Sequence, residues 1–238
     1  MRSAAVVAAT LMPILIAGCG HVVAGVPRPA AAAVELLPTE AELTDAVGNG
    51  LSTFDFQPFV GGLEIMPDGF RDDADATPFR CIGVTETMLR ATYEGADVVE
   101  AARQSYFTLA EGADVTGADA AAVRFGSAAA AQDRFAAFTE QWRDCDGQAV
   151  VKHLRGASDT DVDAAIGDVV AEDGLLSAAV VTRQGSDAPQ QHYLRAVAVR
   201  EATIVEVSLA VAQVDPSGSD DRAERAAAVM LNKVGTEH

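Results

Sequence analysis

The second half of the chain alternates hydrophobic and polar residues in short runs, which are separated by glycine, aspartate and other turn-forming residues. Such alternation is typical of a β-strand with one buried face. It predicts strands at residues 150–154, 166–172, 175–183, 192–200 and 204–212. The connections are short, as at Arg200-Glu201-Ala202, and short connections favour antiparallel neighbours.

The strand pattern is weaker in the first half of the chain. Residues 119–125 predict a further strand. Residues 98–107 have an apolar spacing that fits either a strand or a short helix, and the local pattern does not separate the two. Residues 51–79 have a loop-like pattern, because glycine, proline and aspartate recur there.

The strongest helical pattern lies at residues 128–145, directly after Ser127, a residue type that commonly caps helices. Its apolar residues recur at steps of three and four and include three aromatic rings: Ala131, Phe135, Phe138 and Trp142. We interpret this aromatic stripe as core packing rather than as a ligand site.

Two further helices are predicted near the ends of the domain. The first begins after Thr39, which forms a capping box with Glu42, and ends before Gly48. The last begins near Asp220 and turns these apolar residues inward: Ala223, Ala227, Met230, Leu231 and Val234. This order of elements predicts an α+β fold, a mainly antiparallel sheet with helices packed on it, as a single domain over residues 36–238.

The N-terminus resembles a bacterial lipoprotein precursor. Arg2 is followed by the apolar segment 4–16, by the small residues Ala17 and Gly18, and then by Cys19. The apolar segment is too short for a spanning helix, which needs about 20 residues. We therefore predict a signal peptide at residues 1–18 and lipidation of Cys19 at the extracytoplasmic face of the cell membrane. The alternative is an ordinary secretory signal, which places no constraint on the residue after cleavage.

Residues 19–35 are predicted to form a flexible tether, because they contain Pro27, Pro29 and a run of four alanines. The net charge of the whole chain is −18, and the signal peptide contains one arginine and no acidic residue. Its removal leaves a net charge of −19. Nucleic acid is an excluded partner, since its binding needs clusters of lysine and arginine.

Cysteine usage predicts one disulfide. If Cys19 carries lipid, Cys81 and Cys145 are the remaining pair in an oxidising compartment, and we expect them to be bridged. The alternative is two free thiols. A zinc site is not expected, because neither cysteine has a histidine at zinc-ligand spacing.

The remaining sequence contains no motif of the common hydrolases, metalloproteases or nucleotide-binding proteins. His153 and His192 lie in predicted strands, where we expect no catalytic role for them. Asp159, Asp161 and Asp163 have the spacing of calcium ligands, but the glycine and glutamate that an EF-hand requires further on are missing. We interpret this segment as a solvated acidic loop, with a looser calcium site as the alternative. No catalytic, metal or cofactor-binding residue is therefore predicted.

Several motifs together are similar to those of one known family. They are Leu36-Leu37-Pro38, the first domain cysteine Cys81, the helix start Phe125-Gly126-Ser127-Ala128 and the sequence Trp142-Arg143-Asp144-Cys145. Over residues 37–234 they resemble the PknH-like extracellular sensor domain of mycobacteria, which occurs on a receptor kinase and in stand-alone lipoproteins. The resemblance implies an α+β domain with a cleft for an unidentified ligand. A second disulfide is usual in the kinase sensor, and here no cysteine follows Cys145.

We therefore expect a membrane-anchored, non-enzymatic lipoprotein that senses or binds a small molecule or cell-envelope component and needs no cofactor. The alternative is an envelope scaffold, in which a sheet face or an exposed helix binds a protein partner.

Overall fold

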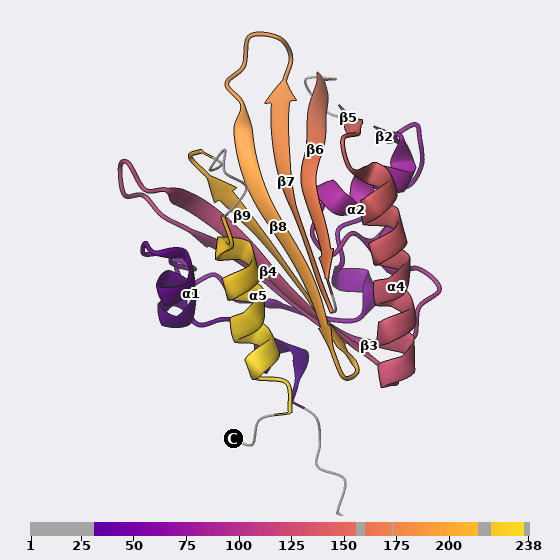
Figure 1. Ribbon diagram of the computed structural model, residues 1–238. Helices are drawn as coiled ribbons and strands as arrows, with labels where there is room; N and C mark the ends of the chain where they lie inside the picture. The colour runs from indigo at the N-terminus through magenta and orange to yellow at the C-terminus, as the bar shows by residue number, and fades with distance from the viewer. Residues whose placement is uncertain (1–30, 156–159, 173, 214–219, 236–238) are drawn as a thin grey trace, which may run out of the picture.

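The computed structural model describes residues 31–155, 160–172, 174–213 and 220–235. Within them nine strands form one antiparallel sheet in the order β1-β3-β4-β9-β8-β7-β6-β5-β2 (Figure 1). The strands are β1 (Phe59–Gly61), β2 (Ala76–Thr77), β3 (Val98–Phe107), β4 (Val115–Phe125), β5 (Ala149–Leu154), β6 (Thr160–Glu172), β7 (Leu175–Gln184), β8 (Gln191–Arg200) and β9 (Thr203–Val211). The predicted α+β fold with an antiparallel sheet is confirmed.

Helices cover both faces of this sheet. They are the 3-10 helices η1 (Ala33–Leu36), η2 (Leu63–Ile65) and η3 (Phe79–Cys81), and the α-helices α1 (Glu40–Val47), α2 (Ile82–Thr85), α3 (Arg90–Tyr93), α4 (Ala128–Cys145) and α5 (Arg222–Asn232). α4 packs on one face, while α1 and α5 lie on the opposite face (Figure 1). In the described part of the chain, no helix is both long enough and apolar enough to cross a membrane.

The helix α4 has the bounds that its sequence pattern predicts. The Ser127 hydroxyl accepts a hydrogen bond from the Ala130 N–H at 3.2 Å, which satisfies one of the unpaired donors of the first turn. Its apolar stripe, including Phe138 and Trp142, is buried in the cluster that α4 forms with α2, α3 and the sheet. The interpretation of the stripe as core packing is confirmed.

The opposite face is covered by η1, α1 and α5. Thr39 and Glu42 form the predicted capping box of α1, and Gly48 ends the helix with a φ of +90°, which glycine adopts without strain. Small side chains let α5 approach the strands closely, and its buried residues are Ala223, Ala226, Ala227 and Met230. Leu231 and Val234 are only half-buried at the edge of this cluster.

Residues 98–107, for which the sequence pattern left strand and helix open, form a strand, β3. Other predicted segments differ from the structure. The strand β6 begins at Thr160, so Asp161 and Asp163 lie in a strand with exposed side chains instead of in an acidic loop, while Asp159 lies outside the described residues. The packed part of the domain begins before residue 36, because Ala33 is buried in η1 and its N–H donates to Glu100 Oε2 at 3.0 Å. The last residues of the segment predicted as a tether therefore belong to the packed domain.

The predicted disulfide between Cys81 and Cys145 is confirmed, with an S–S distance of 2.02 Å. It joins the end of η3 to the last residue of α4. The two ends of the described chain lie together, because Lys233 Nζ donates to the Leu37 carbonyl at 2.7 Å. Figure 1 shows them at the end of the molecule opposite the turn between β7 and β8.

Candidate functional site

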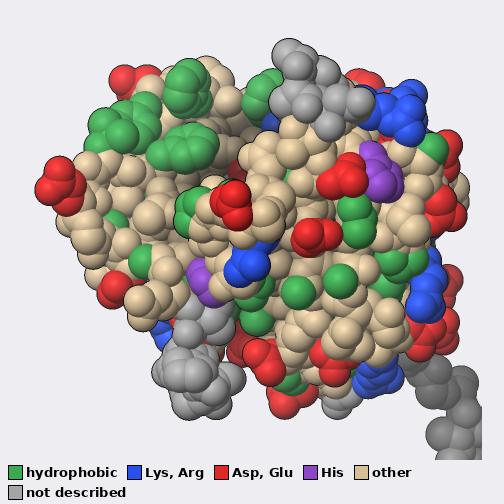
Figure 2. All heavy atoms as spheres, turned by 90° about the horizontal axis from the view of Figure 1, so that it is seen from above, with side chains coloured by type: hydrophobic (Ala, Val, Ile, Leu, Met, Phe, Trp, Pro, Cys, Tyr) green, Lys and Arg blue, Asp and Glu red, His purple; other side chains and the backbone are tan. Residues whose placement is uncertain are grey.

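A cleft of about 420 Å³ opens on the α4 side of the sheet, at the end where β7 and β8 are joined. The strands β3 to β9 contribute its floor and one side, and residues 67–70 and 85–88 form the other side. Its size is that of a small-molecule site, for which about 300–1,000 Å³ is usual. Figure 2 shows this end of the molecule, with large hydrophobic side chains gathered at one corner beside a hollow.

The cleft exists because the side chains on the α4 face of the strands change from apolar to polar along each strand. Side chains on one face recur at every second residue. In the apolar cluster that α4 completes, these positions carry Ala101, Ala121, Val197 and Ile204. Two or four residues further toward the end of the sheet, the same face carries Arg103, Asp119, Tyr193 and Ser208. These polar positions border a cavity where α4 no longer covers the strands.

The cleft contains charges of both signs. Lys152 and Glu86 neutralise each other, with Nζ and Oε1 2.5 Å apart. The Arg103 guanidinium lies 5.0 Å from the centre of the Phe59 ring, and Asp119 accepts a hydrogen bond from the Ser105 hydroxyl. Among the described residues neither Arg103 nor Asp119 forms an ion pair. The cleft therefore presents one uncompensated cation and one uncompensated anion.

Tyr193 lines the same cleft from β8, which β9 separates from β4 and Asp119. Burial raises the pKa of its phenol, and the carboxylates of Glu86 and Asp119 raise it further. The hydroxyl donates to Gln191 Oε1 at 3.1 Å. At neutral pH the phenol is uncharged, so Tyr193 contributes a polar group without adding charge.

A buried ion pair lies behind the wall of the cleft. Arg195 on β8 and Glu206 on β9 are 1% and 3% exposed, and Arg195 Nη2 donates to Glu206 Oε2 at 3.0 Å. The Tyr93 hydroxyl donates to Glu206 Oε1 at 2.5 Å. Burial raises the pKa of Tyr93 well above its usual 10.0, and the negative charge of Glu206 adds to this effect. Tyr93 therefore remains a hydrogen-bond donor at all ordinary pH values.

This ion pair holds the cleft wall against the sheet. Arg195 donates to the Glu86 carbonyl at 2.9 Å and to the Thr87 hydroxyl, and the Met88 N–H donates to Glu206 Oε2 at 3.1 Å. Met88 has a φ of +52°, which is unfavourable for a residue with a side chain. Each hydrogen bond to a charged group contributes about 1.5–3 kcal/mol, enough to hold this conformation.

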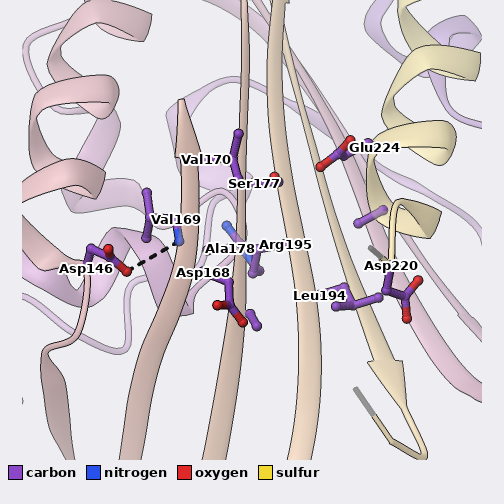
Figure 3. A pocket seen from close by; sticks show the side chains of 12 residues that line it. Asp146, Asp168, Val169, Val170, Ser177, Ala178, Leu194, Arg195, Asp220 and Glu224 are labelled. Carbon is purple, nitrogen blue, oxygen red and sulfur yellow. Dashed lines mark hydrogen bonds between the residues drawn. The ribbon is translucent and has the colours of Figure 1, made fainter. Parts of the chain in front are cut away.

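A second groove, of about 320 Å³, lies beside α5 and the irregular part of β6 (Figure 3). Asp168 has a φ of +54° where the register of β6 shifts between Gly167 and Val170. The charged side chains around the groove are mainly carboxylates: Asp146, Asp168, Asp220 and Glu224. Asp146 accepts from the Val169 N–H at 3.3 Å, and Arg222 binds Asp220 and lowers its pKa. Two of these carboxylates are thus already bound within the protein.

The histidines do not form a common site. His153 on β5 has its Nδ1 2.8 Å from Asp161 on the neighbouring β6, whereas His192 lies on β8. Two strands, β6 and β7, separate β5 from β8. In the described ranges, no group of three or more His, Cys, Asp and Glu residues could hold a metal ion. Cys19, the predicted lipidation site, lies outside these ranges.

The residues predicted from the sequence do not include Arg103, Asp119, Arg195 and Glu206. For the last two a signal exists, because Glu206 stands within Ile204-Val205-Glu206-Val207, and a charge inside an apolar strand implies a buried partner. No local signal identifies Arg103 and Asp119, whose role depends on the cavity that they border. The mixed charge and polar lining make the cleft, rather than the acidic groove, the candidate functional site.

Comparison with known proteins identifies a family and a solved structure that this chain resembles. No curated protein sequence matches the chain. The crystal structure of the extracellular domain of PknH from Mycobacterium tuberculosis is similar, with a TM-score of 0.72 and 17% sequence identity over 88% of this chain and 99% of that chain. Residues 28–233 match the family described as PknH-like extracellular domain. The chain therefore belongs to the PknH-like extracellular domain family.

Proposed function

We propose that this protein is a lipid-anchored, extracytoplasmic sensor-type lipoprotein that binds a small molecule or cell-envelope component in its cleft. The observation that supports this proposal is the cleft. Its wall is fixed by the buried Arg195–Glu206 pair, and its interior presents polar groups that the protein itself does not use. A site that is rigid before binding loses less entropy when a ligand arrives.

Binding without catalysis is the role that the chemistry of the cleft supports. Nucleophilic catalysis needs a nucleophile within hydrogen-bond reach of a base. Glu86 is paired with Lys152. The Ser105 hydroxyl does donate to Asp119, but a carboxylate alone is too weak a base to activate a serine hydroxyl, a role that a histidine has in hydrolases. Both histidines alternate with cleft-lining residues on their strands, so their side chains lie on the opposite face of the sheet. We therefore assign the protein no reaction of its own.

The proposal includes a lipid anchor at the N-terminus of the mature protein. Cys19 would carry the lipid, and two or more acyl chains hold a protein stably at a membrane, whereas a single chain binds reversibly. The described chain begins at the end of the domain opposite the cleft (Figure 1). An anchored domain would therefore present its cleft away from the membrane, toward the cell envelope.

Native mass spectrometry of the full-length protein, purified gently from its membrane fraction, tests ligand binding. We expect a reproducible adduct on the wild type and its loss in the double variant Arg103→Gln, Asp119→Asn. The matched control is Arg183→Gln, Asp133→Asn, which changes the same residue types at exposed positions outside the cleft. An adduct that survives the cleft variant, or a bare chain in every sample, would contradict the proposal.

The anchor is tested separately by Cys19→Ala. We expect the wild type in the membrane pellet, with a mass that includes a diacylglyceryl group, and the variant in the soluble fraction. Equal distribution of the two proteins would exclude lipidation at Cys19.

A protein-partner function is the second candidate, and one observation favours it. The buried hydrophobic residues of β5 and β6 all belong to the cluster on the α4 side, so none of the described elements covers the α5 side of these strands. Figure 1 shows this uncovered part of the sheet beside α5. Stoichiometric binding of one partner that Val151→Glu on β5 abolishes, together with no small-molecule adduct, would favour this function.

A further inference from the structure

The polar groups of the cleft include both donors and acceptors that are free for a ligand. Within the described part of the chain, the Ser208 hydroxyl, the Gln191 amide nitrogen and the Arg103 guanidinium have no hydrogen-bond partner. Asp119 accepts one hydrogen bond through Oδ1, and its second oxygen accepts none from the described residues. Arg103 and Ser208 are half-buried, whereas Asp119 and Gln191 are exposed at the mouth of the cleft. Together these groups favour a ligand that can both donate and accept hydrogen bonds.

The balance of charge favours a neutral ligand. A phosphate or carboxylate that approached Arg103 would also meet Asp119, in a protein whose net charge is −18. A cation that approached Asp119 would meet Arg103 on the neighbouring strand β3. A hydroxyl group avoids this conflict, because it can donate to a carboxylate and accept from a guanidinium at the same time. Neighbouring hydroxyls match the paired nitrogens and oxygens of these two groups.

An exposed aromatic surface adjoins the cleft at the edge of the sheet. We call it the aromatic edge; it consists of Phe54, Phe56, Phe59 and Phe107, which are 45%, 66%, 58% and 44% exposed. Contiguous exposed apolar side chains commonly mark a binding surface. Figure 2 shows hydrophobic side chains gathered at this end of the molecule.

The backbone connects the aromatic edge to the cleft. Phe107 follows Arg103 by four residues on β3, so both side chains lie on the same face of the sheet. The Phe59 ring lies against the guanidinium of Arg103. Ser52 pairs with Phe107 through two backbone hydrogen bonds of 2.8 Å, which brings the following loop to the same edge. The aromatic edge is therefore an extension of the cleft surface.

The loop that carries this edge is strained. Phe54 and Asp55 have φ angles of +49° and +62°, a region that residues with side chains rarely adopt. Strain of about 1–3 kcal/mol for each such residue is concentrated at binding sites and switches. An exposed aromatic residue held in this conformation is more simply explained by a ligand than by folding.

We propose that the ligand is a neutral saccharide chain, with its first units in the cleft and later units on the aromatic edge. A sugar ring carries hydroxyl groups around its rim and C–H groups on its faces. The hydroxyls pair with Arg103, Asp119 and Ser208, and the C–H faces lie on the electron-rich faces of the phenylalanine rings. This inference rests on the proposed function of the cleft and names its ligand class.

The first test is the composition of the ligand that co-purifies with the full-length protein. In native mass spectrometry the released adduct should fragment by loss of whole sugar residues. An adduct that contains no sugar, for example a fatty acid or a phosphate ester, overturns the saccharide assignment but leaves the ligand-binding function intact. A bare protein overturns both.

The second test separates the two parts of the surface. The mature lipoprotein in nanodiscs is titrated with the identified saccharide and with its two-unit fragment. Arg103→Gln should weaken the binding of both at least tenfold, whereas Phe56→Ser should weaken only the longer chain, about threefold or more. Arg183→Gln and Val170→Ser are the controls, since both residues are exposed outside the cleft and the aromatic edge.

Phe56 suits this test because it is 66% exposed, so its replacement leaves the core intact. Equal affinities of wild type and Phe56→Ser for the longer chain would remove the aromatic edge from the proposal. Unchanged binding in Arg103→Gln would overturn the placement of the saccharide in the cleft. An unchanged melting temperature of each variant shows that a loss of binding is local.

Discussion

Replacement of Glu206 by glutamine tests whether the buried ion pair holds the cleft wall. Glutamine keeps the size of the side chain but removes its charge, and it places an NH₂ group where only hydrogen-bond donors approach. In the wild type those donors are Arg195 Nη2, the Tyr93 hydroxyl and the Met88 N–H. At least one of them, and the charge of Arg195, would lose its partner in the variant.

The expected cost follows from the depth of the pair. Arg195 is 1% exposed, so water cannot replace the lost carboxylate. Breaking one side of a buried pair costs about 3–5 kcal/mol, because the remaining charge is left without compensation. For a domain of this size the melting temperature falls by about 2–4 °C for each kcal/mol, which gives a decrease of roughly 6–20 °C.

Urea denaturation followed by circular dichroism measures this loss in the oxidised protein. Glu172→Gln is the matched control, because Glu172 is exposed at the end of β6. Amide hydrogen exchange should also become faster in residues 86–93, the segment that the pair holds. A loss no larger than that of the control, with unchanged exchange, would refute the assigned role of the pair. In the double variant Arg195→Met, Glu206→Gln the two effects should not add.

Three further predictions concern stability. Cys81→Ser should cost about 4 kcal/mol, since the bridge to Cys145 closes a 64-residue loop, and equal melting of reduced and oxidised protein would contradict this. Burial raises the pKa of Tyr93 and Tyr106 above the value of about 10 that tyrosine has in the unfolded chain. The stability that their protonated forms contribute is therefore complete below pH 10 and is lost as the pH rises through the raised pKa values. Near-ultraviolet absorbance should show no phenolate at these two residues before the protein unfolds. Ser127→Ala should cost about 1 kcal/mol in urea denaturation, because α4 loses its cap, whereas Ser127→Asp should retain most of it.

The sequence predicts α4 well because two independent signals agree there: the Ser127 cap and the aromatic stripe. The strand β6 shows why other boundaries are lost. Ala164 and Ile166 point into the core, but after the bulge at Asp168 the inward positions are Val169 and Ala171. A bulge changes which residues face the core, so the two halves of β6 do not share one alternation. Only the second half was predicted as a strand.

The cleft could not be predicted in the same way, because no single segment contains it. Its residues come from positions 67–208 and meet only when β3, β4 and β9 pair with β8 and β7. Local patterns report which face of a strand is buried, not how far a helix extends along it. The family resemblance supplied a cleft as an expectation, and the structure supplies the residues that line it.

The cleft wall is attached to the rest of the protein at three points, which links stability to binding. The disulfide holds the wall segment at Cys81, the Arg195–Glu206 pair holds its middle at residues 86–88, and the hydroxyl of Tyr93 holds its end. The disulfide and the Tyr93 hydroxyl lie outside the cleft lining, whereas residues 86–88 belong to it. Each of the three contacts fixes the distance between that wall and the sheet. A variant that loosens any of them should therefore weaken binding as well as stability, because the ligand must then supply the order that the wild-type protein already has. Variants at Arg103 or Phe56 should weaken binding alone.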